Sequence, residues 1–191
     1  FVYHGFRYMQ LSGKDKASSI PKGLEILEVE AFVLCSELEK TGRFESSDNY
    51  INKYVENTRW SMIDNYLSVP TDCPQRDERY GWLADAQIFM RTSSYLADVD
   101  SFMSKFMVDC NDDFKDGLYP GAVLQFNPTA AIGGWTDGGI IIPWRLYQQY
   151  GNKNVMAENY DNMKAYIDHM IIEANTTGFT QIGRASCRGR G

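Results

Sequence analysis

Residues 71–89 read TDCPQRDERYGWLADAQIF and place several charges beside aromatic rings at the start of an apolar run. The charged side chains are those of Asp72, Arg76, Asp77, Glu78, Arg79 and Asp85. Hydrolysis of a glycosidic bond needs two carboxyl groups in different protonation states, one acid and one base or nucleophile. The stretch is therefore a candidate glycosidase segment, but a charged loop that caps a helix would explain the spacing equally well.

Glu78 is the best candidate for the acid within this stretch. The two aromatic rings that follow it would remove water from its carboxyl group, and nearby aspartates supply like charge. Both effects raise a carboxyl pKa. We expect Arg76 to pair mainly with Asp72 or Asp85, so that these ionised aspartates bind the hydroxyl groups of a sugar.

The composition of the whole chain is that of a soluble globular protein. Of its 191 residues 43% are hydrophobic, 14% aromatic and 23% charged, with a net charge of −6. This acidic balance excludes a nucleic-acid partner, which needs clustered Lys and Arg. The longest apolar run, 139–144, is too short to span a membrane. The chain opens on Phe1, so we expect its natural start to be missing. Periplasmic, secreted and cytoplasmic locations all stay open, as does the oligomeric state.

The four cysteines and the last ten residues carry little information on the fold. Cys35, Cys73, Cys110 and Cys187 show no CxxC pair, and free thiols are favoured over disulfides. Residues 182–191, IGRASCRGRG, resemble translated sequencing-adapter sequence, with a disordered basic tail as the alternative. We therefore leave this segment out of the fold prediction.

The apolar pattern changes from strand-like to helical after Gly42. Residues 1–38 are rich in Val, Ile, Phe and Tyr and roughly alternate, which predicts strands. The later periodicity predicts consecutive helices with a long irregular segment, 112–134, between them. We expect helices from Ser46 or Ser47 to Asn65, from near Trp82 through Tyr95, from Asp100 or Ser101 through Cys110, from Asp137 to Tyr150 and from Val155 to Asn175. Helical hairpins in series predict a bundle or an α/α toroid.

Three segments together resemble one enzyme family. TDCPQRDERYGWLADAQIF closely resembles the DCPQRDERLGWTGDAQ signature of the bacterial-type α-L-rhamnosidases, glycoside hydrolase family 78. YHGFRY at residues 3–8 is similar to the end of the β-sandwich domain that precedes the catalytic domain in that family. GGWTDGGIIIPWRLYQQYGN at residues 133–152 resembles a later segment of the family. The departures are Tyr80 in place of Leu and Leu83-Ala84 in place of Thr-Gly.

The resemblance implies a mainly α fold, a partial (α/α)6 barrel preceded by a short β-sandwich remnant. The corresponding domains are residues 1–42 for the sandwich strands and 43–181 for the barrel, with 182–191 as a non-native tail. The family's general acid falls on Glu78, and no cofactor or metal is implied. Its sugar-binding positions fall on Asp72, Arg76, Trp82, Asp85 and Trp135.

The activity implied is the inverting release of terminal α-L-rhamnose from a rhamnose-containing glycoside or polysaccharide. In the family the catalytic base is a glutamate on a much later helix, and no residue here matches it. We therefore expect the chain by itself to be catalytically incomplete. Another six-hairpin glycosidase and a non-catalytic carbohydrate-binding module are the alternatives.

Some further residues are better explained by structure than by function. Asp109 to Asp116 resembles a calcium-binding loop, but Phe114 and Pro120 stand where that loop needs Gly and Glu. Trp144, Tyr147 and Tyr150 recur at helical spacing and are predicted to fill the core. Asp137 is predicted to cap a helix, with a sugar contact as its alternative role.

Overall fold

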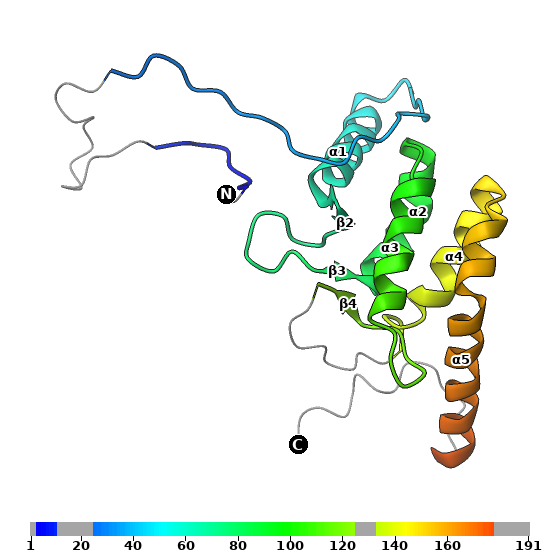
Figure 1. Cartoon of the computed structure of the whole chain (residues 1–191). Helices are drawn as coiled ribbons and strands as arrows, with labels where there is room; N and C mark the ends of the chain where they lie inside the picture. The colour runs from blue at the N-terminus through cyan, green and yellow to red at the C-terminus, as the bar shows by residue number, and fades with distance from the viewer. Residues whose placement is uncertain (1–2, 11–24, 125–132, 178–191) are drawn as a thin grey trace.

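The structure is a computed structural model that describes residues 3–10, 25–124 and 133–177, and it is mainly helical in that part of the chain (Figure 1). The helices are α1 (Asn49–Asn65), α2 (Leu83–Leu96), α3 (Asp100–Asp112), α4 (Gly138–Tyr150) and α5 (Lys153–Thr177). The strands are β1 (Tyr66–Leu67), β2 (Val69–Pro70), β3 (Gly81–Trp82) and β4 (Ala122–Val123). The pairs β1–β2 and β3–β4 are both antiparallel. The prediction of consecutive helices is confirmed.

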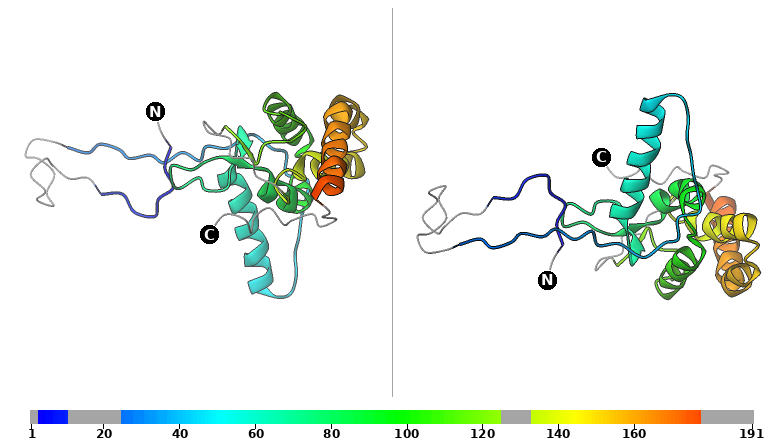
Figure 2. Two further views of the ribbon diagram at one scale, coloured as in Figure 1. Left: turned by 90° about the horizontal axis from the view of Figure 1, so that it is seen from below. Right: turned by 90° about the horizontal axis from the view of Figure 1, so that it is seen from above.

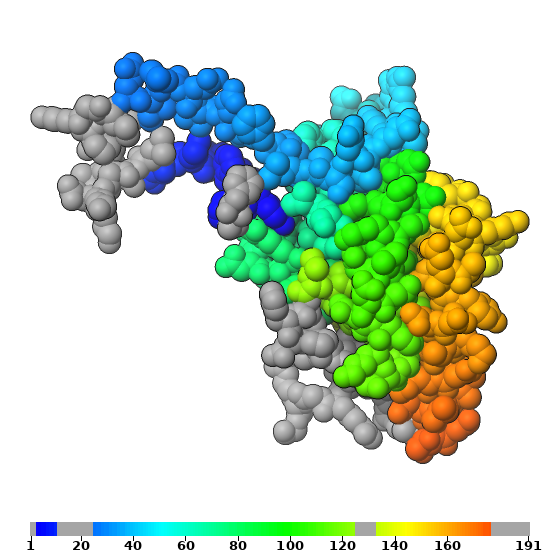
Figure 3. All heavy atoms as spheres, in the orientation of Figure 1, coloured from blue at the N-terminus to red at the C-terminus, as the bar shows by residue number. Residues whose placement is uncertain are grey.

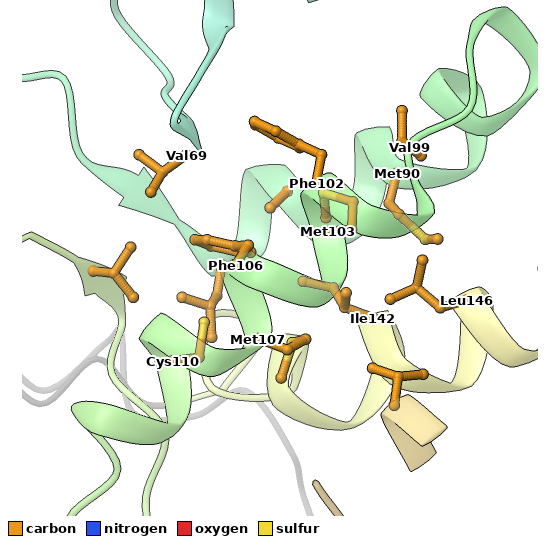
Figure 4. Close-up of a cluster of buried hydrophobic side chains, with 14 of the residues drawn as sticks. Val69, Met90, Val99, Phe102, Met103, Phe106, Met107, Cys110, Ile142 and Leu146 are labelled. Atoms are coloured by element: carbon orange, nitrogen blue, oxygen red, sulfur yellow. The ribbon is translucent and has the colours of Figure 1, made fainter. Parts of the chain in front are cut away.

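The core lies between α2, α3 and α4, and α4 also packs against α5. The apolar face predicted for α3 is confirmed, because Phe102, Phe106 and Cys110 are all buried there. Figure 4 shows these side chains in one cluster with Ile142 and Leu146 of α4. Each fully buried Leu, Ile or Phe side chain stabilises the fold by about 1.5–3 kcal/mol relative to leaving it exposed.

The starts of α1 and α3 differ from the predicted caps. Asp48 caps α1, because its Oδ1 accepts hydrogen bonds from the backbone N–H groups of Tyr50 and Ile51. Ser46 instead accepts a hydrogen bond from the backbone of Asp48, at 3.2 Å, and so supports the cap. The helix α3 begins at Asp100 without a side-chain cap at Val99. At both sites several adjacent polar residues compete for the same N–H groups, so spacing did not decide between them.

The strands predicted for residues 1–38 are not present in the described part, 3–10 and 25–38. Figures 2 and 3 show most of this part as an extended arm that lies away from the helices, and its end at residues 35–38 reaches α1 and α2. A strand needs a neighbour that accepts and donates backbone hydrogen bonds. Here single bonds attach the segment, such as Ser36 N–H to the Tyr66 carbonyl at 2.8 Å. Phe32 is 77% exposed and Leu27 is 87% exposed, so these apolar side chains are not covered by any of the residues that the structure describes. The domain boundary at residue 42 stays a prediction.

The aromatic residues of α4 also differ from the prediction. Trp144 is 46% exposed and Tyr147 is 37% exposed, so the prediction that they fill the core is wrong for both. Tyr150 is packed against the core, and its hydroxyl group accepts a hydrogen bond from Val99 N–H at 3.1 Å. The helix ends as predicted at Gly151, whose φ of 68° is left-handed.

Cys35, Cys73 and Cys110 are free thiols, as predicted. Cys187 and the segment 182–191 lie outside the described residues. Among the residues described, none of the helices combines the length and the apolar character that a bilayer span requires.

Candidate active site

Apart from Trp135, the predicted site residues lie on the loop between β2 and β3, in β3 and on the first turn of α2. Pairing of Trp82 with Ala122 holds the end of this loop in β3, and the Leu83 N–H donates to the Gly121 carbonyl at 3.0 Å. The loop begins at Thr71, whose hydroxyl donates to the Asn65 carbonyl at 2.9 Å. Figure 1 shows β2, β3 and β4 together beside α3. The folded helices thus fix both ends of the charged stretch.

Glu78 is the centre of a hydrogen-bonded group on this loop. Its Oε1 accepts a hydrogen bond from the Trp82 ring N–H at 2.9 Å, and its Oε2 is paired with Arg76 Nη2 at 2.5 Å. The expectation that Arg76 pairs with Asp72 or Asp85 is therefore wrong. Arg76 and Glu78 are two residues apart on an irregular loop, whose path brings the guanidinium to the Glu78 carboxylate.

The protonation of the two neighbouring carboxyl groups also differs from the expectation. The hydrogen bond from Trp82 lowers the pKa of Glu78, and Asp72 and Arg76 lower it further, against the effect of its burial. Burial raises the pKa of Asp72, and the nearby Glu78 raises it further. The predicted rise for Glu78 is thus wrong. The rings do not simply remove water from it, because the Trp82 N–H stabilises its ionised form.

Cys73 connects this group to Asp72. Its thiol donates to Asp72 Oδ2 at 3.1 Å, and this contact is the main cause of a raised pKa of the Cys73 thiol. One ligand atom each of Asp72, Cys73 and Glu78 lie within 4.8 Å of one another. A metal ion would need the thiolate form of Cys73 and would be repelled by the Arg76 guanidinium, so this arrangement fits a hydrogen-bonded group better than a metal site.

We expect Asp72→Asn to increase the rate at which iodoacetamide alkylates Cys73 at pH 8 by about three- to tenfold. The substitution removes the negative charge that raises the thiol pKa, so more thiolate is present at that pH. Arg76→Gln is expected to slow the reaction, because Arg76 lowers the same pKa. Peptide mass spectrometry measures the rate at Cys73, with the exposed Cys35 as the internal reference. An unchanged or slower reaction in Asp72→Asn would contradict the assignment.

A cavity of about 180 Å³ adjoins the group. It is lined by Asn65, Tyr66, Asp72, Asp85 and Phe89, among others. Asn65 Oδ1 and Asp72 Oδ1 are buried and have no hydrogen-bond partner within the described residues. The cavity therefore combines unused oxygen acceptors with aromatic walls, which are the groups that bind hydroxyls and apolar faces of a ligand.

Trp135 lies on the turn that precedes α4 and is half-buried. The side-chain amide of Gln87, on α2, donates to the Gly134 carbonyl and so holds this turn against the helix that carries Asp85. The helix α2 thus connects the turn that carries Trp135 to the hydrogen-bonded residues around Glu78. Asp137 occupies the N-cap position of α4 as predicted, but its side chain does not cap the helix. It accepts a hydrogen bond from the Tyr166 hydroxyl at 2.7 Å instead.

Sequence reasoning did not single out Asn65, Cys73, Gln87 or Tyr166. Cys73 and Gln87 lie inside the quoted stretch, where the charged residues were the stronger signal. Asn65 and Tyr166 are ordinary helical positions in the sequence, and only folding brings them to the site. No local pattern could have identified these two.

A series of packed helices with neighbouring carboxyl groups on the loop before α2 is compatible with the predicted class, a glycosidase built from helical hairpins. The model of the bacterial α-L-rhamnosidase six-hairpin glycosidase domain matches residues 39–186. The chain belongs to this family.

Curated relatives agree with this assignment. An α-L-rhamnosidase of Formosa agariphila is 37% identical over 171 residues, which cover 88% of this chain and 18% of that protein. An α-L-rhamnosidase of an Alteromonas species is 35% identical over 173 residues, with 88% and 18% covered. The chain thus spans about a fifth of the length of these relatives.

Solved structures show the same fold. An α-L-rhamnosidase from Dictyoglumus thermophilum superposes with a TM-score of 0.68 at 35% identity, covering 70% of this chain and 15% of that one. The Streptomyces avermitilis α-L-rhamnosidase complexed with L-rhamnose gives 0.68 at 33% identity, covering 71% and 13%. The expected fold, part of a six-hairpin barrel, is confirmed.

Proposed function

We propose that this chain is part of a glycoside hydrolase that releases terminal α-L-rhamnose from rhamnose-containing glycosides or polysaccharides. The cavity beside the loop carries the proposal, because Asn65 Oδ1 and Asp72 Oδ1 are buried acceptors that find no partner among the described residues. Sugar hydroxyls are donors for such oxygens. The aromatic walls, Tyr66 and Phe89, suit the methyl group of a 6-deoxy sugar. Relatives named α-L-rhamnosidases and a neighbour complexed with L-rhamnose support this choice of sugar.

In this proposal Glu78 is the general acid. Asp72 and Asp85 accept hydrogen bonds from sugar hydroxyls at the cavity. Trp82 orients Glu78 through its ring N–H, and Arg76 holds the second carboxylate oxygen of Glu78. Trp135 is proposed as an aromatic wall on the turn before α4, since stacking on a ring is a common way to bind the apolar face of a sugar.

The acid must gain a proton before it can act. Without a sugar the Trp82 hydrogen bond and the Arg76 guanidinium favour the ionised form of Glu78, whose pKa is lowered. The Arg76 side chain is 61% exposed and so is free to move when a sugar binds. Loss of this ion pair together with loss of water would raise the pKa of Glu78. We propose that Glu78 then takes up from the solvent the proton that it donates to the leaving oxygen.

The proposed reaction inverts the anomeric centre, which needs a second carboxyl group about 6.5–9.5 Å from the acid. Asp72 and Glu78 are within 4.8 Å of each other, closer than an inverting pair. Asp72 is therefore assigned to sugar binding, and the base is assigned to no residue of this chain.

We expect L-rhamnose to raise the melting temperature of this chain by about 2 °C or more at concentrations far above the Kd. D-Glucose, which differs from L-rhamnose in ring stereochemistry and carries a hydroxymethyl group in place of the methyl group, should give no shift. Asp72→Asn and Asp85→Asn should each abolish the rhamnose shift by weakening acceptors at the cavity. Differential scanning fluorimetry measures the effect, with Asp161→Asn, an exposed residue of α5, as the matched control.

Equal shifts with both sugars would contradict the proposed specificity, and no shift with either would contradict sugar binding at this cavity. The same chain is expected to give no turnover of an aryl α-L-rhamnoside, because the base is assigned elsewhere. Turnover that Glu78→Gln abolishes would support Glu78 as the acid and refute the expectation of incompleteness.

A further inference from the structure

The turn of residues 133–137 places Trp135 at the entrance to α4. Asp137 N–H donates to the Gly133 carbonyl at 3.3 Å, and Gly138 N–H donates to the Trp135 carbonyl at 3.1 Å. Gly139 N–H donates to the Thr136 carbonyl at 3.1 Å. These bonds fix the backbone on either side of Trp135, but they do not fix how the turn sits against the other helices.

Tyr166 of α5 attaches this turn to the neighbouring helix. Its hydroxyl donates to Asp137 Oδ1 at 2.7 Å and lies 3.0 Å from Thr136 Oγ1. Thr136 Oγ1 also donates to the Gly133 carbonyl at 3.1 Å. Each hydroxyl carries one proton, so the Tyr166 proton goes to the carboxylate and the Thr136 proton is shared between its two acceptors. The Tyr166 hydroxyl thus makes hydrogen bonds with both residues that directly follow Trp135, Thr136 and Asp137.

This contact is buried, and its geometry is specific. Tyr166 is 1% exposed and Thr136 is 0% exposed, so neither hydroxyl is exchanged freely with water. Burial also raises the pKa of Tyr166, which keeps the phenol protonated as a donor. On the other side of Trp135, the Gln87 amide of α2 donates to the Gly134 carbonyl. Trp135 is therefore held between bonds from α2 and α5, two helices that come from different parts of the chain.

We propose that Tyr166 is a positioning residue that, through Thr136 and Asp137, fixes Trp135 as the aromatic wall of the sugar site. This role rests on the proposed function for the identity of the ligand, but the contact itself does not. It also gives Asp137 a role other than capping or sugar binding, because its carboxylate is engaged by Tyr166. Packing alone does not need the hydroxyl, since a Phe ring would fill the same space against Tyr119.

The test labels the chain with 5-fluorotryptophan, whose fluorine signal reports on the environment of each ring. The chain has four tryptophans, and Trp135→Phe identifies the signal of interest. Tyr166→Phe keeps the ring and removes the hydroxyl, so we expect the Trp135 signal to shift or broaden while that of Trp82 stays. Tyr160→Phe is the matched control, because Tyr160 lies on the same helix and is 60% exposed. The Kd for L-rhamnose should rise about three- to tenfold in Tyr166→Phe, as expected for one lost hydrogen-bonded contact.

An unchanged Trp135 signal in folded Tyr166→Phe would overturn the proposal. If this variant does not fold, Thr136→Val decides, because it removes one hydroxyl of the same group at almost constant volume. It should move the Trp135 signal, and an unmoved signal would refute the role. Failure of the unsubstituted chain to bind L-rhamnose would contradict the proposed function instead, and the fluorine signal would still test the positioning role.

Discussion

Phe106→Ala is expected to lower the free energy of unfolding by about 3–5 kcal/mol, which is typical of a buried Phe cut back to Ala. Phe106 is 0% exposed and lies in the cluster of Figure 4 with Val69 and Cys110. A Cβ atom placed on Gly81 would lie 2.8 Å from Phe106 Cε2, so this ring packs directly beneath β3. The cavity left by the substitution would open under the strand that leads to Trp82. Urea denaturation followed by circular dichroism measures the change.

Two further variants make the result specific. Phe106→Leu keeps most of the volume and should cost less than about 1.5 kcal/mol. Phe44→Ala removes the same ring from a residue that is 53% exposed, and it should stay within about 0.5 kcal/mol of the parent chain. If Phe106→Ala lowers the free energy of unfolding no more than Phe44→Ala does, the packing of Phe106 beneath β3 does not stabilise the fold as proposed.

The helices could be predicted from the sequence because each buries one apolar face at helical spacing. α3 illustrates this, since Phe102, Phe106 and Cys110 recur every four residues and all are buried. The pattern of residues 1–38 could not show in the same way whether strands form there. A helix satisfies its own backbone hydrogen bonds, whereas a strand depends on a neighbour that the local sequence does not specify.

The sequence proposed residues for the candidate site, an assignment that stays a prediction, but it did not predict the electrostatics of the site. The resemblance assigned Glu78 and the surrounding positions, whereas the direction of the Glu78 pKa depends on which donors reach its oxygens. The Trp82 ring contributes an N–H as well as an apolar surface, and Arg76 lies two residues away on a loop of irregular path. These contacts reverse the effect that burial alone would have. Tyr166 lies on α5, some thirty residues after Trp135 in the sequence, so no local motif could identify its contact with the turn.

Gly139→Ala is expected to destabilise the chain by about 3 kcal/mol, near the upper end for overpacking of a core. The added Cβ would lie 2.1 Å from Tyr119 Cδ2 and 2.3 Å from its Cγ, so the clash involves the near side of the ring. Tyr119 is 2% exposed and its ring contacts Phe114 and Tyr166, with centroids 4.9 Å and 5.9 Å away. It therefore cannot swing aside. The gain of about 1 kcal/mol in helix propensity on replacing Gly by Ala is too small to offset this clash.

Gly134→Ala is the matched control for this prediction, because the same change five residues earlier meets no atom within 4 Å. Its stability should change by less than about 0.5 kcal/mol. Since Gly139 lies in the first turn of α4, directly after the Trp135 turn, Gly139→Ala should also move the Trp135 fluorine signal. Tyr119→Leu in the same chain should recover part of the lost stability, because it removes the ring that the new Cβ meets. Additive losses in the double variant would place the origin of the effect outside the contact between Gly139 and Tyr119.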